Sequence, residues 1–134
     1  MKNLLGTISG INIFVHDYDE AIAFYQGVLG FELIEDMAMG TEKRWVTLKP
    51  NTACQTQIIL SKAQSAEKKS LVGKQAGSSV LMILTTPDFD RTYQHYIDHG
   101  VTFSEAPRRE PYGKVVIFED LYGNKFDLIE PAKR

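Results

Sequence analysis

Apolar and polar residues alternate near the start of the chain and predict a half-buried strand from Gly10 to Val15. One face of this strand would carry Ile11, Ile13 and Val15, and the other face Asn12 and Phe14. A helix is expected next, because Asp17 can cap it, Glu20 stands at the capping-box spacing and Gly30 suits its exit. The apolar stripe of that helix consists of Ala21, Ile22, Tyr25, Val28 and Leu29.

The same pattern recurs in the second half of the chain. Residues 88–96 (DFDRTYQHY) line up with residues 17–25 (DYDEAIAFY) at an offset of 71, which falls to 70 where Gly100 matches Gly30. The second helix can begin at Asp88, or at Thr86 with Pro87 in the first helical position. Few letters are identical, but aromatic, glycine and strand positions recur in one order, which indicates an internal repeat.

Three further strands are predicted after each helix: residues 30–35, 44–48 and 55–60, then 100–105, 114–119 and 125–130. Residues 62–78 are polar and lysine-rich and predict a linker with room for one short helical turn, whose lysines, such as Lys68, Lys69 and Lys74, are solvated. The expected fold is α+β, with residues 1–134 as a single domain. Two βαβββ modules, about 7–61 and 79–131, would form one curved mixed sheet around a central cavity, with the helices outside.

Composition and charge exclude several classes of function. Fifteen basic and seventeen acidic residues give a net charge of -2, which leaves no surplus of positive charge to hold nucleic acid. The single cysteine, Cys54, cannot form a disulfide within the chain. Residues 1–10 lack the apolar stretch of a signal peptide, and no segment approaches the length of a membrane span. A soluble, cytoplasmic protein with no nucleic-acid or membrane partner is expected.

Several segments resemble one known superfamily: VHDYDEAIAFYQGVLGFELIED, RWVTL and, near the end, GVTFSEAP and FEDLYGNKFDLIE. They are similar to the vicinal oxygen chelate superfamily, which includes glyoxalase I, bleomycin resistance proteins, fosfomycin resistance enzymes and extradiol dioxygenases. The resemblance covers nearly the whole chain and implies two βαβββ modules around a shared cavity, often in a dimer. It also implies, for enzymatic members, a divalent metal that chelates two neighbouring substrate oxygens and is held by the first and last strands of each module.

The resemblance places the four metal positions at Gly10, Gln57, Val80 and Asp127, with Leu81 as the alternative to Val80. Glycine, valine and leucine offer no side-chain donor. One carboxylate and one amide carbonyl remain, whereas zinc, nickel and iron sites use about three or four protein donors. We therefore predict no metal and no other cofactor, except under the metal-dependent alternative given below.

Asp127 is the candidate catalytic residue. Its neighbours Phe126 and Leu128 belong to the opposite strand face, so Asp127 is predicted to point into the cavity. There it could act as a general base with a raised pKa or anchor a cationic ligand group; an aspartate satisfied by local hydrogen bonds is the alternative. The residues of the same parity are predicted to bind substrate: Asn12, Phe14, Gln57 and Ile59.

Arg44 and Trp45 open a predicted strand, and the alternation does not decide which of them faces the cavity. Arg44 could bind a carboxylate or phosphate, Trp45 could stack on a planar ligand, and a core tryptophan beside a surface arginine is the alternative. Tyr112 lies with Arg108 and Arg109 in a predicted loop that could form the cavity mouth. Tyr112 is therefore a further substrate-binding candidate, and solvated loop residues are the alternative.

Three functions fit these residues. The first is a glyoxalase/bleomycin resistance-like protein that binds a small organic molecule without the usual metal, for sequestration or for acid/base chemistry with Asp127 as proton acceptor. The second is a divalent-metal-dependent lyase or dioxygenase that uses Asp127 and Gln57 with waters or a donor from a second subunit. The third is a non-catalytic subunit that binds another protein through open sheet edges. The resemblance also predicts a homodimer, while the ligand is not identified.

Overall fold

The structure, a computed structural model, describes residues 3–133. The chain divides between Val72 and Gly73 into two compact units, here called unit one and unit two. None of the helices among the described residues is both long and apolar enough to cross a membrane.

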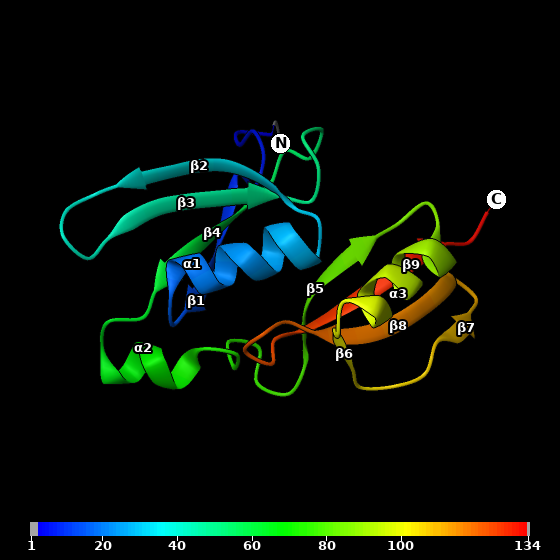
Figure 1. Cartoon of the computed structure of the whole chain (residues 1–134). Helices are drawn as coiled ribbons and strands as arrows, with labels where there is room; N and C mark the ends of the chain where they lie inside the picture. Colours follow the sequence, from blue (N-terminus) through cyan, green and yellow to red (C-terminus); the bar gives the residue numbers. More distant parts are fainter. Residues whose placement is uncertain (1–2, 134) are drawn as a thin grey trace. The chain divides into compact units, whose positions relative to one another are not determined.

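Unit one contains a four-stranded mixed sheet with a helix against one face (Figure 1). Its elements are β1 (Gly10–Val15), α1 (Tyr18–Ile22), the π-helical segment η1 (Ala23–Val28), β2 (Glu32–Ala38), β3 (Arg44–Lys49), β4 (Gln57–Lys62) and α2 (Ala66–Leu71). The strand order is β1-β4-β3-β2, with β1 and β4 parallel and the other pairs antiparallel.

Unit two repeats this plan. Its elements are β5 (Val80–Thr85), α3 (Phe89–Asp98), β6 (Thr102–Phe103), β7 (Arg108–Glu110), β8 (Gly113–Glu119) and β9 (Lys125–Pro131). The order is β5-β9-β8-β6, with β5 and β9 parallel and β7 paired with β8. The predicted α+β class with two βαβββ modules is confirmed. The strands form two mixed sheets, one in each unit, whereas one curved sheet was predicted, because the strands of residues 3–133 pair by hydrogen bonds only within each unit.

Local capping interactions start both main helices where the sequence predicts. Asp17 caps α1, because its Oδ2 accepts a hydrogen bond of 2.8 Å from the Glu20 backbone N–H. Asp88 caps α3 in the same way through the Arg91 N–H, at 3.2 Å. The choice between Thr86 and Asp88 is therefore decided for Asp88. Thr86 instead accepts a hydrogen bond from the Asp88 N–H through its hydroxyl, at 3.2 Å.

The apolar core of each unit lies on the helix-covered face of its sheet. In unit one, Ile13, Val15, Val46, Leu48 and Leu60 are almost fully buried. In unit two, an aromatic cluster takes this place: Phe118 lies edge-on to Tyr96 at 5.4 Å between ring centroids and contacts Phe126 at 5.3 Å. Burial of these side chains fixes which residues are left for the opposite face of each sheet.

One predicted helix and one predicted loop differ from the structure. The first helix does not remain α-helical to its end, because the Leu29 N–H donates to the Phe24 carbonyl five residues earlier, at 3.0 Å. Residues 108–110 were predicted as loop but form β7, which pairs with β8 through a tight turn at residues 111–112. The prediction of a loop was wrong because this strand is short and owes its pairing to β8 rather than to its own alternation.

Candidate functional site

A pocket of about 490 Å³ lies on the face of the unit-one sheet that carries Asn12, Phe14 and Ile59, called the pocket face below. These residues alternate with Ile13, Val15 and Leu60 of the core, so the strand period alone places them here; Leu60 also contributes to the pocket lining although it is buried. Thirteen residues line the pocket: Asn12, Phe14, Tyr18, Met39, Lys43, Arg44, Trp45, Ile59, Leu60, Ser61, Lys62, Gln64 and Lys68. Its size matches that of small-molecule sites, which span roughly 300–1,000 Å³.

Trp45 lies on the pocket face, held by a carboxylate from the neighbouring strand. Its register partner on β2 is Met37, and its indole N–H donates to Glu35 Oε1 at 3.2 Å. The Ser61 hydroxyl, across the same face, donates to Asn12 Oδ1 at 3.1 Å. The pocket therefore combines aromatic walls with a few fixed polar groups, the usual composition of a small-molecule site.

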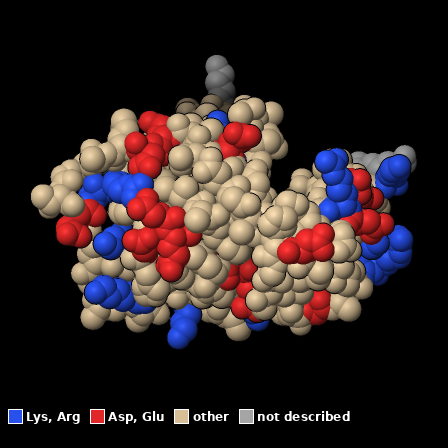
Figure 2. All heavy atoms as spheres, viewed as in Figure 1, with Lys and Arg blue, Asp and Glu red and all other residues tan. Residues whose placement is uncertain are grey.

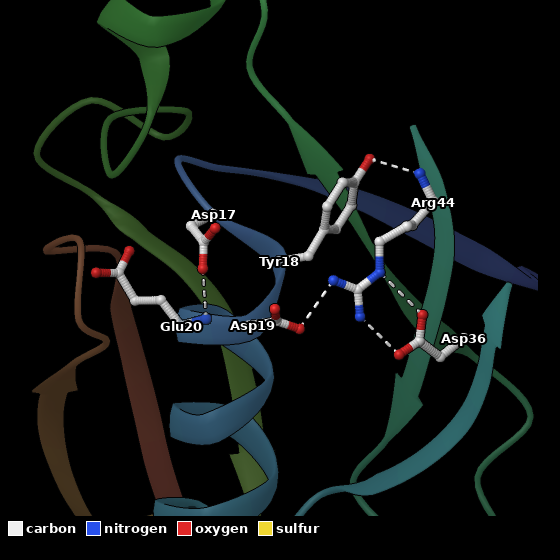
Figure 3. A network of polar contacts seen from close by, with 6 residues as sticks. All are labelled: Asp17, Tyr18, Asp19, Glu20, Asp36 and Arg44. Atoms are coloured by element: carbon white, nitrogen blue, oxygen red, sulfur yellow. Dashed lines mark hydrogen bonds and ion pairs between the residues drawn. The ribbon is translucent and has the colours of Figure 1, made fainter. Parts of the chain in front are cut away.

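Arg44 contributes to the frame of the pocket. Its guanidinium binds Asp36 through two hydrogen bonds, Nε to Oδ1 at 3.1 Å and Nη2 to Oδ2 at 2.7 Å, and binds Asp19 of α1 at 2.8 Å (Figure 3). It also lies over the Tyr18 ring at 5.2 Å, and the Arg44 N–H donates to the Tyr18 hydroxyl at 3.2 Å. The hydrogen bonds that Arg44 donates to Asp36 and Asp19 raise the pKa of Arg44 above its ordinary value. The Arg44 guanidinium, predicted as a binding group for a ligand carboxylate or phosphate, is thus already bound by two carboxylates of the chain.

The strand registers relate the two units more accurately than the sequence repeat does. Asp127 lies between Ile83 of β5 and Ile117 of β8. At the repeat offsets of 71 and 70, Ile83 and Ile117 correspond to Asn12 of β1 and Thr47 of β3. The residue that pairs with both Asn12 and Thr47 in unit one is Ile59. Gln57, which the repeat offset matched to Asp127, lies two residues earlier and pairs with Gly10. The unit-one counterpart of Asp127 is therefore Ile59, a correction that removes one of the two predicted oxygen donors.

The residues at the family's metal positions do not fit a metal. A Cβ built on Gly10 would lie 2.6 Å from Ile59 Cδ1, so an isoleucine side chain occupies the space next to that position. Val80 pairs with Lys125 beside an irregularity of the register between Val80 and Met82. Val80 and Leu81 both have hydrocarbon side chains, so neither could replace the missing donor at this position. Among residues 3–133, no group of three or more His, Cys, Asp or Glu side chains could hold a metal ion. Among the family's metal positions, Asp127 alone carries a strong donor.

Asp127 lies on the unit-two sheet in a partly buried environment. Its Oδ1 is buried and has no hydrogen-bond partner among the described residues. Burial raises the pKa of Asp127; the positive charge of Arg108 acts against this shift and the negative charge of Glu105 adds to it. Arg108 is in turn held by Glu105 at 3.0 Å and Glu110 at 2.8 Å, and its Nη1 lies 3.5 Å from the Tyr112 hydroxyl. Two of the predicted mouth residues, Arg108 and Tyr112, thus belong to a cluster with Glu105 and Glu110, and the charges of Arg108 and Glu105 act on Asp127.

Replacing Asp127 by asparagine is expected to raise the free energy of unfolding at pH 7 by roughly 1 kcal/mol. Because the pKa of Asp127 is raised in the folded chain, its carboxylate destabilises the fold above that pKa, and the cost vanishes below the unfolded value of about 3.9. The advantage of the variant over the native protein, measured by urea unfolding, should therefore shrink as the pH falls toward 3.5. An advantage that is constant with pH, or absent at pH 7, would contradict this assignment.

Sequence reasoning missed the lysines at the pocket and the glutamate behind the tryptophan. Lys68 is exposed, as predicted, and lies in α2, the short helix for which the predicted linker left room; its place in the pocket lining was not predicted. α2 begins where the Ser65 hydroxyl accepts a hydrogen bond from the Lys68 N–H at 3.1 Å. The serine three residues before Lys68 is a helix-start signal that could have indicated this helix. Lys43, Lys62 and Glu35 carried no local signal, because the β2–β3 and β3–β4 registers bring them to the site.

Comparisons with known proteins agree in family and fold. Residues 7–128 match the model of the Glyoxalase/Bleomycin resistance protein/Dioxygenase superfamily. An uncharacterised protein of Shewanella frigidimarina (strain NCIMB 400) is 41% identical over 125 residues, 92% of this chain and 93% of that protein. The crystal structure of UcmS2 has 30% identity and a TM-score of 0.82, covering 95% of this chain and 99% of that chain. TnmS3, an antibiotic binding protein from Streptomyces sp. CB03234, has 23% identity and a TM-score of 0.79, covering 98% of this chain and all of that chain.

Proposed function

The chain belongs to the Glyoxalase/Bleomycin resistance protein/Dioxygenase superfamily, and we propose that it binds a small organic molecule in the unit-one pocket without using the superfamily's metal. The observation that carries this proposal is the pocket of about 490 Å³ with Phe14 and Trp45 in its walls, beside a Gly10 position that offers no donor. The likeness to an antibiotic binding protein supports a ligand of antibiotic type.

The lining of the pocket favours sequestration over catalysis. None of the thirteen lining residues is an aspartate or glutamate, so proton abstraction inside the pocket has no obvious carboxylate base. Asp127 belongs to unit two and remains the candidate base for the acid/base version of the proposal. Binding that leaves the ligand unchanged therefore needs fewer assumptions about the residues that line the pocket.

Binding can be tested by the intrinsic fluorescence of Trp45, the single tryptophan of the chain. We expect saturable quenching by the neutral probe N-phenyl-1-naphthylamine, and by members of an antibiotic panel. Ser61→Phe places a phenyl ring in the pocket, where Ser61 pairs with Phe14 across β1 and β4, and should weaken probe binding by at least about tenfold. Circular dichroism would check that the variant is folded.

The matched control is Ser78→Phe, which adds the same ring at an exposed turn outside the pocket lining and should leave probe affinity unchanged. Probe affinity that is equal in the native protein and in Ser61→Phe would place binding elsewhere. A lack of saturable quenching with every compound would argue against a small-molecule site at Trp45.

A further inference from the structure

The charges around the unit-one pocket are unbalanced at its rim, here meaning the exposed part of the lining that carries Lys43 and Lys68. Its charged lining residues are all basic: Lys43, Arg44, Lys62 and Lys68. Arg44 is compensated by Asp19 and Asp36, and Lys62 lies 3.6 Å from Glu42. By contrast, the ammonium groups of Lys43 and Lys68 form no ion pair with any of residues 3–133. Two uncompensated positive charges therefore remain at the pocket.

These two lysines reach the pocket from separate elements. Lys43 immediately precedes β3, whereas Lys68 lies on α2, which packs near β1 within unit one. Basic side chains gather over α2 in the space-filling view (Figure 2). The chain as a whole has a net charge of -2, so the attraction for an anion is local to this rim and not a property of the whole surface.

The walls of the pocket below this rim are aromatic and apolar. Phe14 and Ile59 stand on neighbouring strands, and Trp45 is fixed by its hydrogen bond to Glu35. A flat ring can stack on an indole, and an ammonium group can bind a carboxylate, sulfonate or phosphate at the ring's edge. A neutral or cationic ligand would make no use of Lys43 and Lys68.

We propose that the ligand of this pocket is an aromatic anion, whose ring system packs against Phe14 and Trp45 and whose acidic group binds Lys43 and Lys68. This inference rests on the proposed function, because it assumes that the pocket binds a small molecule. It adds the chemical class of that molecule. It also gives a role to two lysines that neither the fold nor the capping of α2 requires.

The test uses two probes that share one ring frame and differ by an anionic group. These are 1-anilinonaphthalene-8-sulfonate and neutral N-phenyl-1-naphthylamine, each followed by quenching of Trp45. In the double variant Lys43→Glu with Lys68→Glu, the affinity for the sulfonate should fall about tenfold at low salt. The affinity for the neutral probe should change less than about twofold. Raising the salt concentration should weaken sulfonate binding in the native protein and not in the double variant.

The control is Lys74→Glu with Lys133→Glu, which changes the net charge equally at two exposed positions outside the pocket and should leave both affinities unchanged. If the neutral probe binds and is blocked by Ser61→Phe, while charge reversal at Lys43 and Lys68 leaves sulfonate binding intact, the ligand class is wrong and the proposed function stands. An equal loss in the control variant would also overturn the ligand class. If neither probe responds to Ser61→Phe, the proposed site itself is wrong.

Discussion

Replacing Asp120 by alanine is expected to lower the free energy of unfolding by about 3 to 5 kcal/mol. Asp120 lies in the turn between β8 and β9 and is 5% exposed. Its Oδ1 accepts hydrogen bonds from the backbone N–H groups of Tyr122 and Asn124, both at 2.9 Å, and its Oδ2 accepts one from the Asn124 side chain at 2.8 Å. Alanine would remove the acceptor of three hydrogen bonds, two of them buried, and each hydrogen bond to a charged group contributes roughly 1.5–3 kcal/mol.

The loss can be measured by urea unfolding at pH 7 and compared with that of two other variants. Asp120→Asn keeps an oxygen for the backbone donors but not for the Asn124 side chain, so we expect an intermediate loss. Asp98→Ala removes an exposed carboxylate at the end of α3 and should cost no more than about 0.5 kcal/mol. Stability of Asp120→Ala within 1 kcal/mol of the native protein would show that this turn does not depend on the carboxylate.

The parts of the fold that depend only on residues close together along the chain were predictable from the sequence. Alternation gave β1 its bounds, Gly10–Val15, and the aspartates at the two helix starts act as caps at the expected positions. β7 was missed because its residues 108–110 lie between Pro107 and Pro111 and have no alternation of their own. Its strand conformation comes from pairing with β8, which local patterns do not encode.

The residues of the candidate site also fall into those that local patterns predict and those that only the fold brings together. Strand parity predicted the pocket-face positions of Asn12, Phe14 and Ile59, because alternation is a local property. The rim lysines were missed because the fold brings together a hairpin end and α2. Gln57 was matched to Asp127 by carrying the repeat offset of 70 into the last strand. When Asn12 and Thr47 are matched to Ile83 and Ile117 at the repeat's own offsets of 71 and 70, the registers match Ile59 to Asp127, an offset of 68. The shared cavity, the homodimer and the cytoplasmic location stay predictions.

Replacing Gly113 by alanine is expected to destabilise the protein by about 3 to 5 kcal/mol. Gly113 begins β8, has a φ of +148° and is buried, which is a conformation that only glycine adopts readily. A Cβ at this position would collide with the Glu130 backbone carbonyl and lie 3.1 Å from the Ala132 nitrogen. Because both atoms belong to backbone, no side-chain rotation can relieve the contact, and β8 must separate from β9.

Gly77→Ala separates the two causes of this loss, which are the positive φ and the collision of the added methyl group with backbone. Gly77 also has a positive φ, +64°, but no atom lies within 4 Å of a Cβ built there, so its substitution should cost only about 1 kcal/mol. The difference between the two variants in urea unfolding then measures the collision at β8. Because that collision lies next to the β7 turn, Gly113→Ala should also release Arg108 from Glu110 and change the pH dependence of stability that Asp127 confers. Equal losses in the two variants would show that backbone conformation alone sets the cost, and that the β8–β9 edge yields to a methyl group.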